Sequence, residues 1–126
     1  MDTPFDEAGI RDQLSADLGA SLRAILVGDL STGDYALSYI RDDIEDLYTP
    51  EEIQQIVNDD LVRHFLEMGT GPSDKLGTLR YEVRGFDDAL FLLAWSHDFA
   101  LGITFERDEH AIPVVIETLE EYRIWG

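Results

Sequence analysis

Histidine is the side chain that most often carries acid–base or metal chemistry near neutral pH, and this sequence has three: His64, His97 and His110. No two of them are three or four residues apart, so no pair shares one helix face, and the sequence has no His-Glu-x-x-His motif. The spacing favours surface or helix-capping histidines over a metal site. We expect no cofactor and no bound metal.

Carboxylates are abundant, and their densest cluster comprises Asp42, Asp43, Glu45 and Asp46. Carboxylate oxygens are the ligands that a hard cation such as Mg²⁺ prefers. The cluster lacks the spacing of an EF-hand loop, so a solvated acidic turn is the simpler interpretation, and cation binding stays open. Paired-carboxylate catalysis needs one acid that is buried and raised in pKa, and no sequence context marks one.

Nucleophilic catalysis is not indicated either. Ser96, His97 and Asp98 are the residue types of a catalytic triad, but neighbours along one strand or turn point apart, whereas a triad is assembled across the fold. The segment 69–72, Gly-Thr-Gly-Pro, lacks the Gly-Lys-Ser/Thr that completes a P-loop. There is no cysteine. We therefore expect a protein that is not an enzyme.

A strip of charged residues, Arg80, Glu82 and Arg84, recurs at every second position and so shares one face of a strand. With Arg23 and Arg41 nearby, this strip could bind an anionic ligand or an acidic partner. The alternative, which we favour, is ion pairing with neighbouring Asp and Glu residues.

Aromatic residues give one further candidate contact. Trp125, beside Ile124, can dock on a partner if it is exposed, or it can fold back onto the sheet, and the sequence does not decide between the two. Phe91 and Trp95 are expected in the core.

The elements that must position these residues alternate between helical and strand patterns. We expect helices at 6–18, at 51–68 and after 111, and strands at 21–28, 35–40, 78–86, 90–96 and 101–106. This order, α-β-β-α-β-β-β-α, predicts an α+β fold with helices packed on a five-stranded antiparallel sheet. The segment 78–106 is expected to supply most of the core of a single domain, residues 1–126.

Local signals set several element ends. Gly19 is a natural helix stop, and Gly33 can take positive φ in the turn between the first two strands. The run Thr49-Pro50-Glu51-Glu52 is a capping box with proline at the first helical position.

Strict alternation predicts which side chains share a face in the first hairpin. Leu22, Ala24 and Leu26 would lie on one side of the first strand, opposite Arg23, Ile25 and Val27. In the second strand, Tyr35, Leu37 and Tyr39 would share a face.

Charge bounds the environment and the partners. The chain has 27 acidic and 9 basic residues, a net charge of −18, and a single lysine. Acids scattered over every element predict a protein of a salt-rich cytoplasm, where salt screens the self-repulsion; the alternative is an ordinary acidic protein. Direct binding to nucleic acid is disfavoured, because it depends on Lys and Arg neutralising phosphates.

No apolar run approaches the roughly 20 residues that span a membrane, and no signal peptide is evident, so we expect a cytoplasmic protein without a membrane partner.

Three short runs carry a resemblance that covers most of the chain. The letters SLR open the first strand, YIRDD closes the second, and YTPEEI begins the second helix. Together with TLRYEVRGFDDALFLLAW, these runs resemble a family of small uncharacterised haloarchaeal proteins. That resemblance implies adaptation to salt and no assigned activity.

The order of elements is similar to the roadblock/LC7 branch of profilin-like folds. This resemblance rests on topology and implies a domain that dimerises and serves as a scaffold or as a regulator of small GTPases. It also implies that the third strand, Thr78–Phe86, and the second helix, Glu51–Met68, meet their mates.

The sequence thus predicts a non-enzymatic protein-interaction or regulatory module, which forms a homodimer and binds an unidentified protein. The alternative is a sensor of a small molecule or anion, with a pocket between the sheet and the helices.

Overall fold

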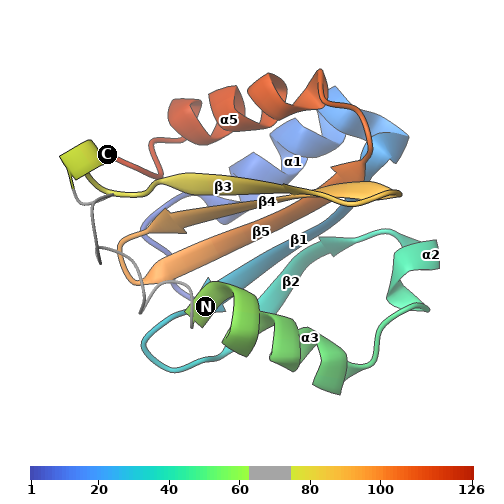
Figure 1. The fold of residues 1–126 in the computed structure, drawn as a ribbon, viewed down its shortest axis with the longest axis horizontal. Helices are drawn as coiled ribbons and strands as arrows, with labels where there is room; N and C mark the ends of the chain where they lie inside the picture. The colour runs from blue at the N-terminus through green and yellow to red at the C-terminus, as the bar shows by residue number, and fades with distance from the viewer. Residues whose placement is uncertain (63–74) are drawn as a thin grey trace.

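In the computed structural model, five strands form one sheet with helices on both of its faces (Figure 1). The structure describes residues 1–62 and 75–126. The strand order is β2-β1-β5-β4-β3, and every neighbouring pair is antiparallel. The strands are β1 (Leu22–Asp29), β2 (Tyr35–Ile40), β3 (Tyr81–Gly85), β4 (Ala89–Ser96) and β5 (Phe99–Glu106). The predicted α+β fold class is confirmed.

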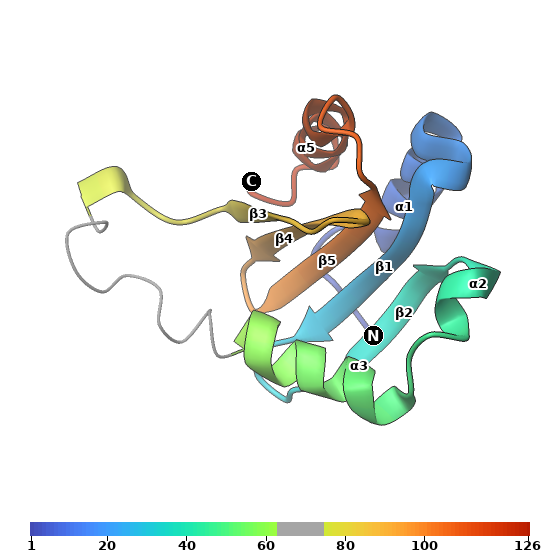
Figure 2. The ribbon, with the colours of Figure 1, turned by 45° about the vertical axis from the view of Figure 1, so that its right-hand side comes forward.

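The helices divide between the two faces, as Figure 2 shows. Helices α1 (Glu7–Leu18) and α5 (Ala111–Glu121) lie together on one face. Helix α3 (Pro50–Ile56) crosses the other face and continues as a π-helical turn, Val57–Val62. A short helix that the sequence analysis did not expect, α2 (Asp42–Glu45), follows β2. The predicted end of the second helix, residues 63–68, lies outside the described residues, as does His64.

Both faces of the sheet are covered with apolar side chains. The larger cluster lies beneath α1 and α5 and includes Leu92, Ile103 and Phe105, each with no exposed surface. The smaller lies beneath α3 and contains Leu26, Val57, Leu61, Leu93, Trp95 and Ala100. Strands β4 and β5 are buried on both faces because they occupy interior positions of the sheet. Trp95 is buried as predicted, whereas Phe91 is partly exposed.

The local capping signals are confirmed. Gly19 ends α1 with a φ of 53°, and Gly33 has a φ of 78° in the turn after β1. The Thr49 hydroxyl accepts a hydrogen bond from the Glu52 N–H at 3.2 Å, and a Glu52 carboxylate oxygen accepts one from the Thr49 N–H at 3.0 Å. Both donors would otherwise be unpaired at the start of α3.

The prediction of strict alternation in β1 was wrong because the strand contains a β-bulge. Leu22 lies opposite Phe105 and Ala24 lies opposite Thr104, so Arg23 is an extra residue without a partner on β5. The bulge turns the side chains of Arg23 and Ala24 toward the same face. Both therefore lie on the α3 face with Leu26, whereas Leu22, Ile25 and Val27 join the larger core.

The prediction that Tyr35, Leu37 and Tyr39 share a face was wrong for the same kind of reason. Leu37 pairs with Leu26 and Tyr39 pairs with Ile25, which leaves Ser38 as the extra residue on β2. Tyr35 packs in the cluster beneath α3, whereas Tyr39 packs against the larger core on the other face.

Candidate functional site

Strand β3 is an edge of the sheet, and in the described part of the chain it pairs only with β4. The Arg80 carbonyl accepts a hydrogen bond from the Trp95 N–H at 3.1 Å, and the Phe86 N–H donates to the Ala89 carbonyl at 2.9 Å. Even-numbered residues of this segment therefore direct their backbone groups to β4. By the alternation of an antiparallel ladder, the N–H and C=O groups of Tyr81 and Val83 point away from the sheet.

On the α5 face, this edge is flanked by an aromatic pair. The rings of Tyr81 and Trp125 have centroids 5.8 Å apart, and the indole N–H of Trp125 donates to the Arg80 carbonyl at 3.2 Å. Trp125 thus folds back onto β3. Tyr81 is 40% exposed, and Phe86, which follows β3 and lies on the α3 face, is 55% exposed, so both faces of the edge keep accessible apolar surface.

On the α3 face, part of the charged strip is held in ion pairs. Arg84 donates to Glu82 at 2.8 Å and to Asp60 at 2.7 Å, which ties β3 to the turn after α3. The hydrogen bonds to Glu82 and Asp60 raise the pKa of Arg84, although partial burial opposes them. Arg80 is exposed. The structure does not bring Arg23 to this strip, because β1 is separated from β3 by β5 and β4.

Arg41 instead joins the start of α2 to β5. It donates to both carboxylate oxygens of Asp43, at 2.6 Å and 3.0 Å, and to Glu106 at 2.7 Å. The hydrogen bond from Arg41 lowers the pKa of Asp43. Among the residues the structure describes, no three His, Asp or Glu side chains are grouped to hold a metal ion, and cation binding by the acidic cluster stays the open alternative to a solvated acidic turn.

Within the described residues, the Ser96 hydroxyl makes no hydrogen bond to His97 or His110. The Ser96 hydroxyl is buried and donates to the Ile124 carbonyl, so it anchors the segment that carries Trp125. His97 occupies the β4–β5 turn with a φ of 56°, and His110 precedes α5.

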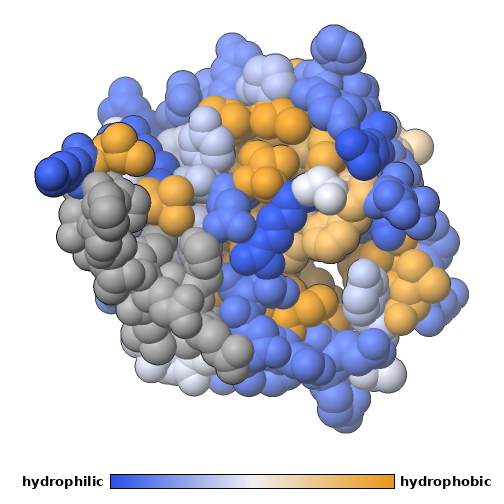
Figure 3. Space-filling model, in the orientation of Figure 1, coloured by the Kyte–Doolittle hydropathy of each residue, from blue (hydrophilic) through white to orange (hydrophobic). Residues whose placement is uncertain are grey.

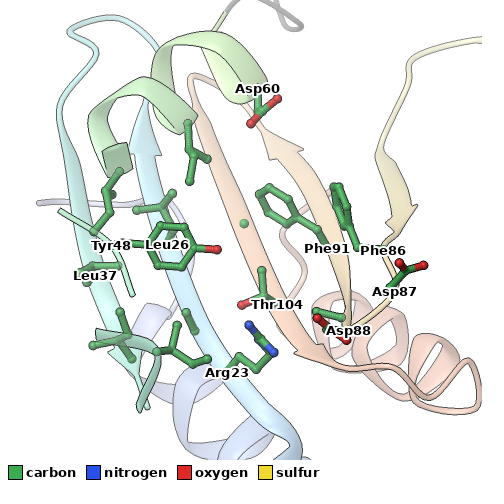
Figure 4. A pocket seen from close by; sticks show the side chains of 17 residues that line it. Arg23, Leu26, Leu37, Tyr48, Asp60, Phe86, Asp87, Asp88, Phe91 and Thr104 are labelled. Atoms are coloured by element: carbon green, nitrogen blue, oxygen red, sulfur yellow. The ribbon is translucent and has the colours of Figure 1, made fainter. Parts of the chain in front are cut away.

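A feature that sequence reasoning did not locate is a cavity of about 460 Å³ on the α3 face. Apolar residues gather around a hollow on this face in the space-filling view (Figure 3). The cavity lies between α2 and α3 on one side and the β3–β4 turn on the other, with the sheet as its floor (Figure 4). Its apolar walls include Leu26, Ile40, Ile44, Ile53, Ile56 and Phe91.

Among the residues the structure describes, Arg23 is the one basic residue that lines this cavity (Figure 4). Its side chain is 15% exposed, and its Nη1 lies 3.8 Å from Glu106, which is beyond hydrogen-bond distance. Glu106 already accepts the 2.7 Å hydrogen bond of Arg41. The signal that could have located this site is the polar arginine between apolar neighbours in the first strand.

A model of one protein family matches residues 8–123, which is nearly the whole chain. The chain belongs to the DUF7522 family, a domain of unknown function. The predicted membership of an uncharacterised family is thus confirmed. The DUF7522 match includes Arg23 and the charged strip of β3 and excludes Trp125.

Solved structures show the same fold at low sequence identity. The DUF7522 chain superposes on Myxococcus xanthus MglB with a TM-score of 0.64 and 13% identity, covering 98% of each chain. It also resembles a roadblock/LC7 domain from Streptomyces avermitilis, with a TM-score of 0.53 and 13% identity, covering 81% of this chain and 85% of that one. The roadblock-like topology is confirmed. No curated protein matches the sequence.

In the part of the chain that the structure describes, no helix is both long and apolar enough to cross a bilayer.

Proposed function

We propose that this DUF7522 domain is a non-enzymatic interaction module that forms a homodimer by pairing β3 with β3 of a second copy. The observation that carries the proposal is the open edge: Tyr81 and Val83 present outward N–H and C=O groups next to exposed apolar side chains. Natural sheets rarely leave such an edge unprotected, because it is a template for pairing with another strand.

The side chains around the edge suit an interface of mixed character. Tyr81 and Trp125 give an aromatic flank on the α5 face, while Arg80, Glu82 and Arg84 give a polar flank on the α3 face. Aromatic residues and arginine are enriched at protein interfaces. A two-fold axis perpendicular to the sheet, between the two β3 strands, would pair them antiparallel and place the α3 faces of the two copies on the same side of a continuous sheet.

The acidic surface supports a salt-rich cytoplasm as the setting. With a net charge of −18, two copies repel each other in dilute buffer, and molar salt reduces the Debye length to about 3 Å. The dimer should therefore form more readily in concentrated KCl. A second partner is an unidentified protein, and the roadblock-like fold supports a regulatory role for that contact.

Sedimentation equilibrium in about 3 M KCl tests the proposal. The wild-type chain should sediment as a dimer. Val83→Pro removes an outward N–H and should yield a monomer without breaking the ladder to β4. The matched control, Val83→Ala, keeps the N–H and should remain dimeric. A monomeric wild type at every concentration, or a dimeric Val83→Pro, would remove the β3 interface.

A second candidate function is a small-molecule sensor, and the cavity on the α3 face favours it. A volume of about 460 Å³ falls in the range of ligand pockets, roughly 300–1,000 Å³.

A further inference from the structure

We infer that the cavity on the α3 face binds a small amphipathic carboxylate, whose charged group pairs with Arg23 and whose apolar body lies against Leu26, Ile53 and Phe91. This inference deepens the sensor function and does not depend on the β3 dimer.

The backbone aims Arg23 into the cavity. In a regular strand its side chain would alternate with those of Leu22 and Ala24, but the bulge opposite Phe105 and Thr104 turns Arg23 and Ala24 to one face. Bulges often re-aim a side chain beside a functional site. Figure 4 shows the guanidinium on the cavity side of the sheet, over the paired strands β1 and β5 and beside Thr104.

The environment of Arg23 leaves its hydrogen-bonding capacity available. A guanidinium carries five N–H donors in a planar fork. Within the described residues, Arg23 makes no hydrogen bond through its side chain, and its nearest carboxylate oxygen, on Glu106, lies 3.8 Å away and is held by Arg41. A mostly buried cation in this state gains from a planar oxyanion, which the guanidinium can bind through two parallel hydrogen bonds.

The acidic residues around the cavity limit how much negative charge the ligand can carry. Asp60 pairs at 2.7 Å with Arg84, which also pairs with Glu82, and Asp87 and Asp88 are exposed at the β3–β4 turn. Exposed carboxylates are screened in concentrated salt, whereas the half-enclosed Arg23 is screened less. These acids and the single arginine favour a monoanion over a di- or trianion such as a nucleotide.

The walls define the rest of the ligand. Ile40, Ile44, Ile53, Ile56 and Phe91 form an apolar lining, so the ligand must carry a hydrophobic body to gain from leaving water. A medium-chain or aromatic carboxylic acid combines this body with one charge. The polar rim and the single Arg–carboxylate pair would fix its orientation.

Three probes that share one alkyl chain test whether the cavity prefers a negatively charged head group, without altering the protein. Octanoate, octan-1-ol and octylammonium are titrated into the full chain in about 3 M KCl, and binding is followed by the methyl NMR signals of Leu26, Ile53 and Ile56. Octanoate should shift these signals saturably and bind roughly tenfold or more tightly than octanol. Equal affinity for octanol, tighter binding of octylammonium, or no saturable shift would overturn the inference.

Variants of the protein then test whether Arg23 causes the preference for octanoate over octanol. Arg23→Met should weaken octanoate roughly tenfold and leave the affinity for octanol unchanged, which also shows that the cavity has not collapsed. Arg11→Met, in α1 on the other face of the sheet, is the matched control and should change neither affinity. Octanoate binding that is indifferent to Arg23 would contradict the assignment.

The variant Val83→Pro distinguishes the ligand proposal from the dimer proposal. If octanoate binds equally to the wild type and to this variant, the ligand site stands whether or not β3 pairs. If octanoate binds only to the variant, the second copy closes the cavity in the dimer, and the inference fails while the dimer stands.

Discussion

Gly102 and Phe91 lie so close on the α3 face that a Cβ at position 102 would stand 2.9 Å from the Phe91 ring. Gly102 sits in the middle of β5, opposite Leu26 on β1 and Leu93 on β4. The missing side chain lets the ring lie against the sheet and form one wall of the cavity. A residue with a side chain here would force the ring outward, into the space that a ligand would use.

Gly102→Ala should therefore displace the Phe91 ring and shrink the cavity. The added methyl group overpacks the site, while alanine also reduces the entropy of the unfolded chain, so the two effects partly cancel. We expect a loss of about 1 kcal/mol in the free energy of unfolding, measured by denaturant titration, and weaker octanoate binding. Gly85→Ala is the matched control, because its Cβ would stand at an ordinary 3.6 Å from Leu90. Unaltered octanoate binding in Gly102→Ala would contradict this placement of the ligand.

Ser96→Ala should release the segment that carries Trp125. The buried Ser96 hydroxyl donates to the Ile124 carbonyl, and removing it leaves that carbonyl without this donor. We expect a cost of about 1–3 kcal/mol in the free energy of unfolding. We also expect faster hydrogen exchange at the Trp125 indole N–H, followed by NMR. The buried Trp95 indole serves as the internal reference, and equal acceleration at both indoles would point to global destabilisation instead.

Arg41→Met should raise the pKa of Asp43. The hydrogen bond from Arg41 holds that pKa below its ordinary value of 3.8, so the pair contributes stability at neutral pH that is lost as the pH falls through the lowered pKa. Carboxyl ¹³C NMR titration measures the change. Asp29 is the control, because its lowered pKa comes from hydrogen bonds with Ser31 and should not respond. An Asp43 pKa that is unchanged in Arg41→Met would show that the pair is not formed in solution.

Salt should stabilise the fold. A net charge of −18 on 126 residues destabilises the compact state by self-repulsion, which screening relieves. Between about 0.1 M and 3 M KCl, the midpoint of thermal unfolding should rise by at least about 5 °C. Sorbitol of matched osmolality should reproduce little of this rise. Equal stability with and without salt would contradict the interpretation of the acidic surface.

Much of the fold could be predicted because its signals are local. The capping box at Thr49 and Glu52, the stop at Gly19 and the turn at Gly33 each depend on a few neighbouring residues, and each is confirmed. The order of the elements then limits the topology, and the roadblock-like sheet follows.

A pocket between the sheet and the helices was expected only as an alternative, and its lining could not be predicted because it depends on non-local geometry. The bulges at Arg23 and Ser38 arise from pairing with β5 and with β1, and neither is visible in the alternation of the strands themselves. Each bulge moves side chains to the opposite face, so the predicted faces were wrong where the site lies. Strand β3, in contrast, lies at an edge of the sheet among the described residues, where the resemblance to roadblock domains implies a contact with a second copy.

Amide hydrogen exchange at Tyr81 and Val83 tests the β3 dimer most directly. Their N–H groups point away from β4, so they are protected only if another strand pairs with them. In about 3 M KCl we predict protection comparable to that of Glu82 and Arg84, which face β4, and loss of this protection on dilution. Rapid exchange at Tyr81 and Val83 at every protein concentration, with Glu82 and Arg84 still protected, would contradict the proposal.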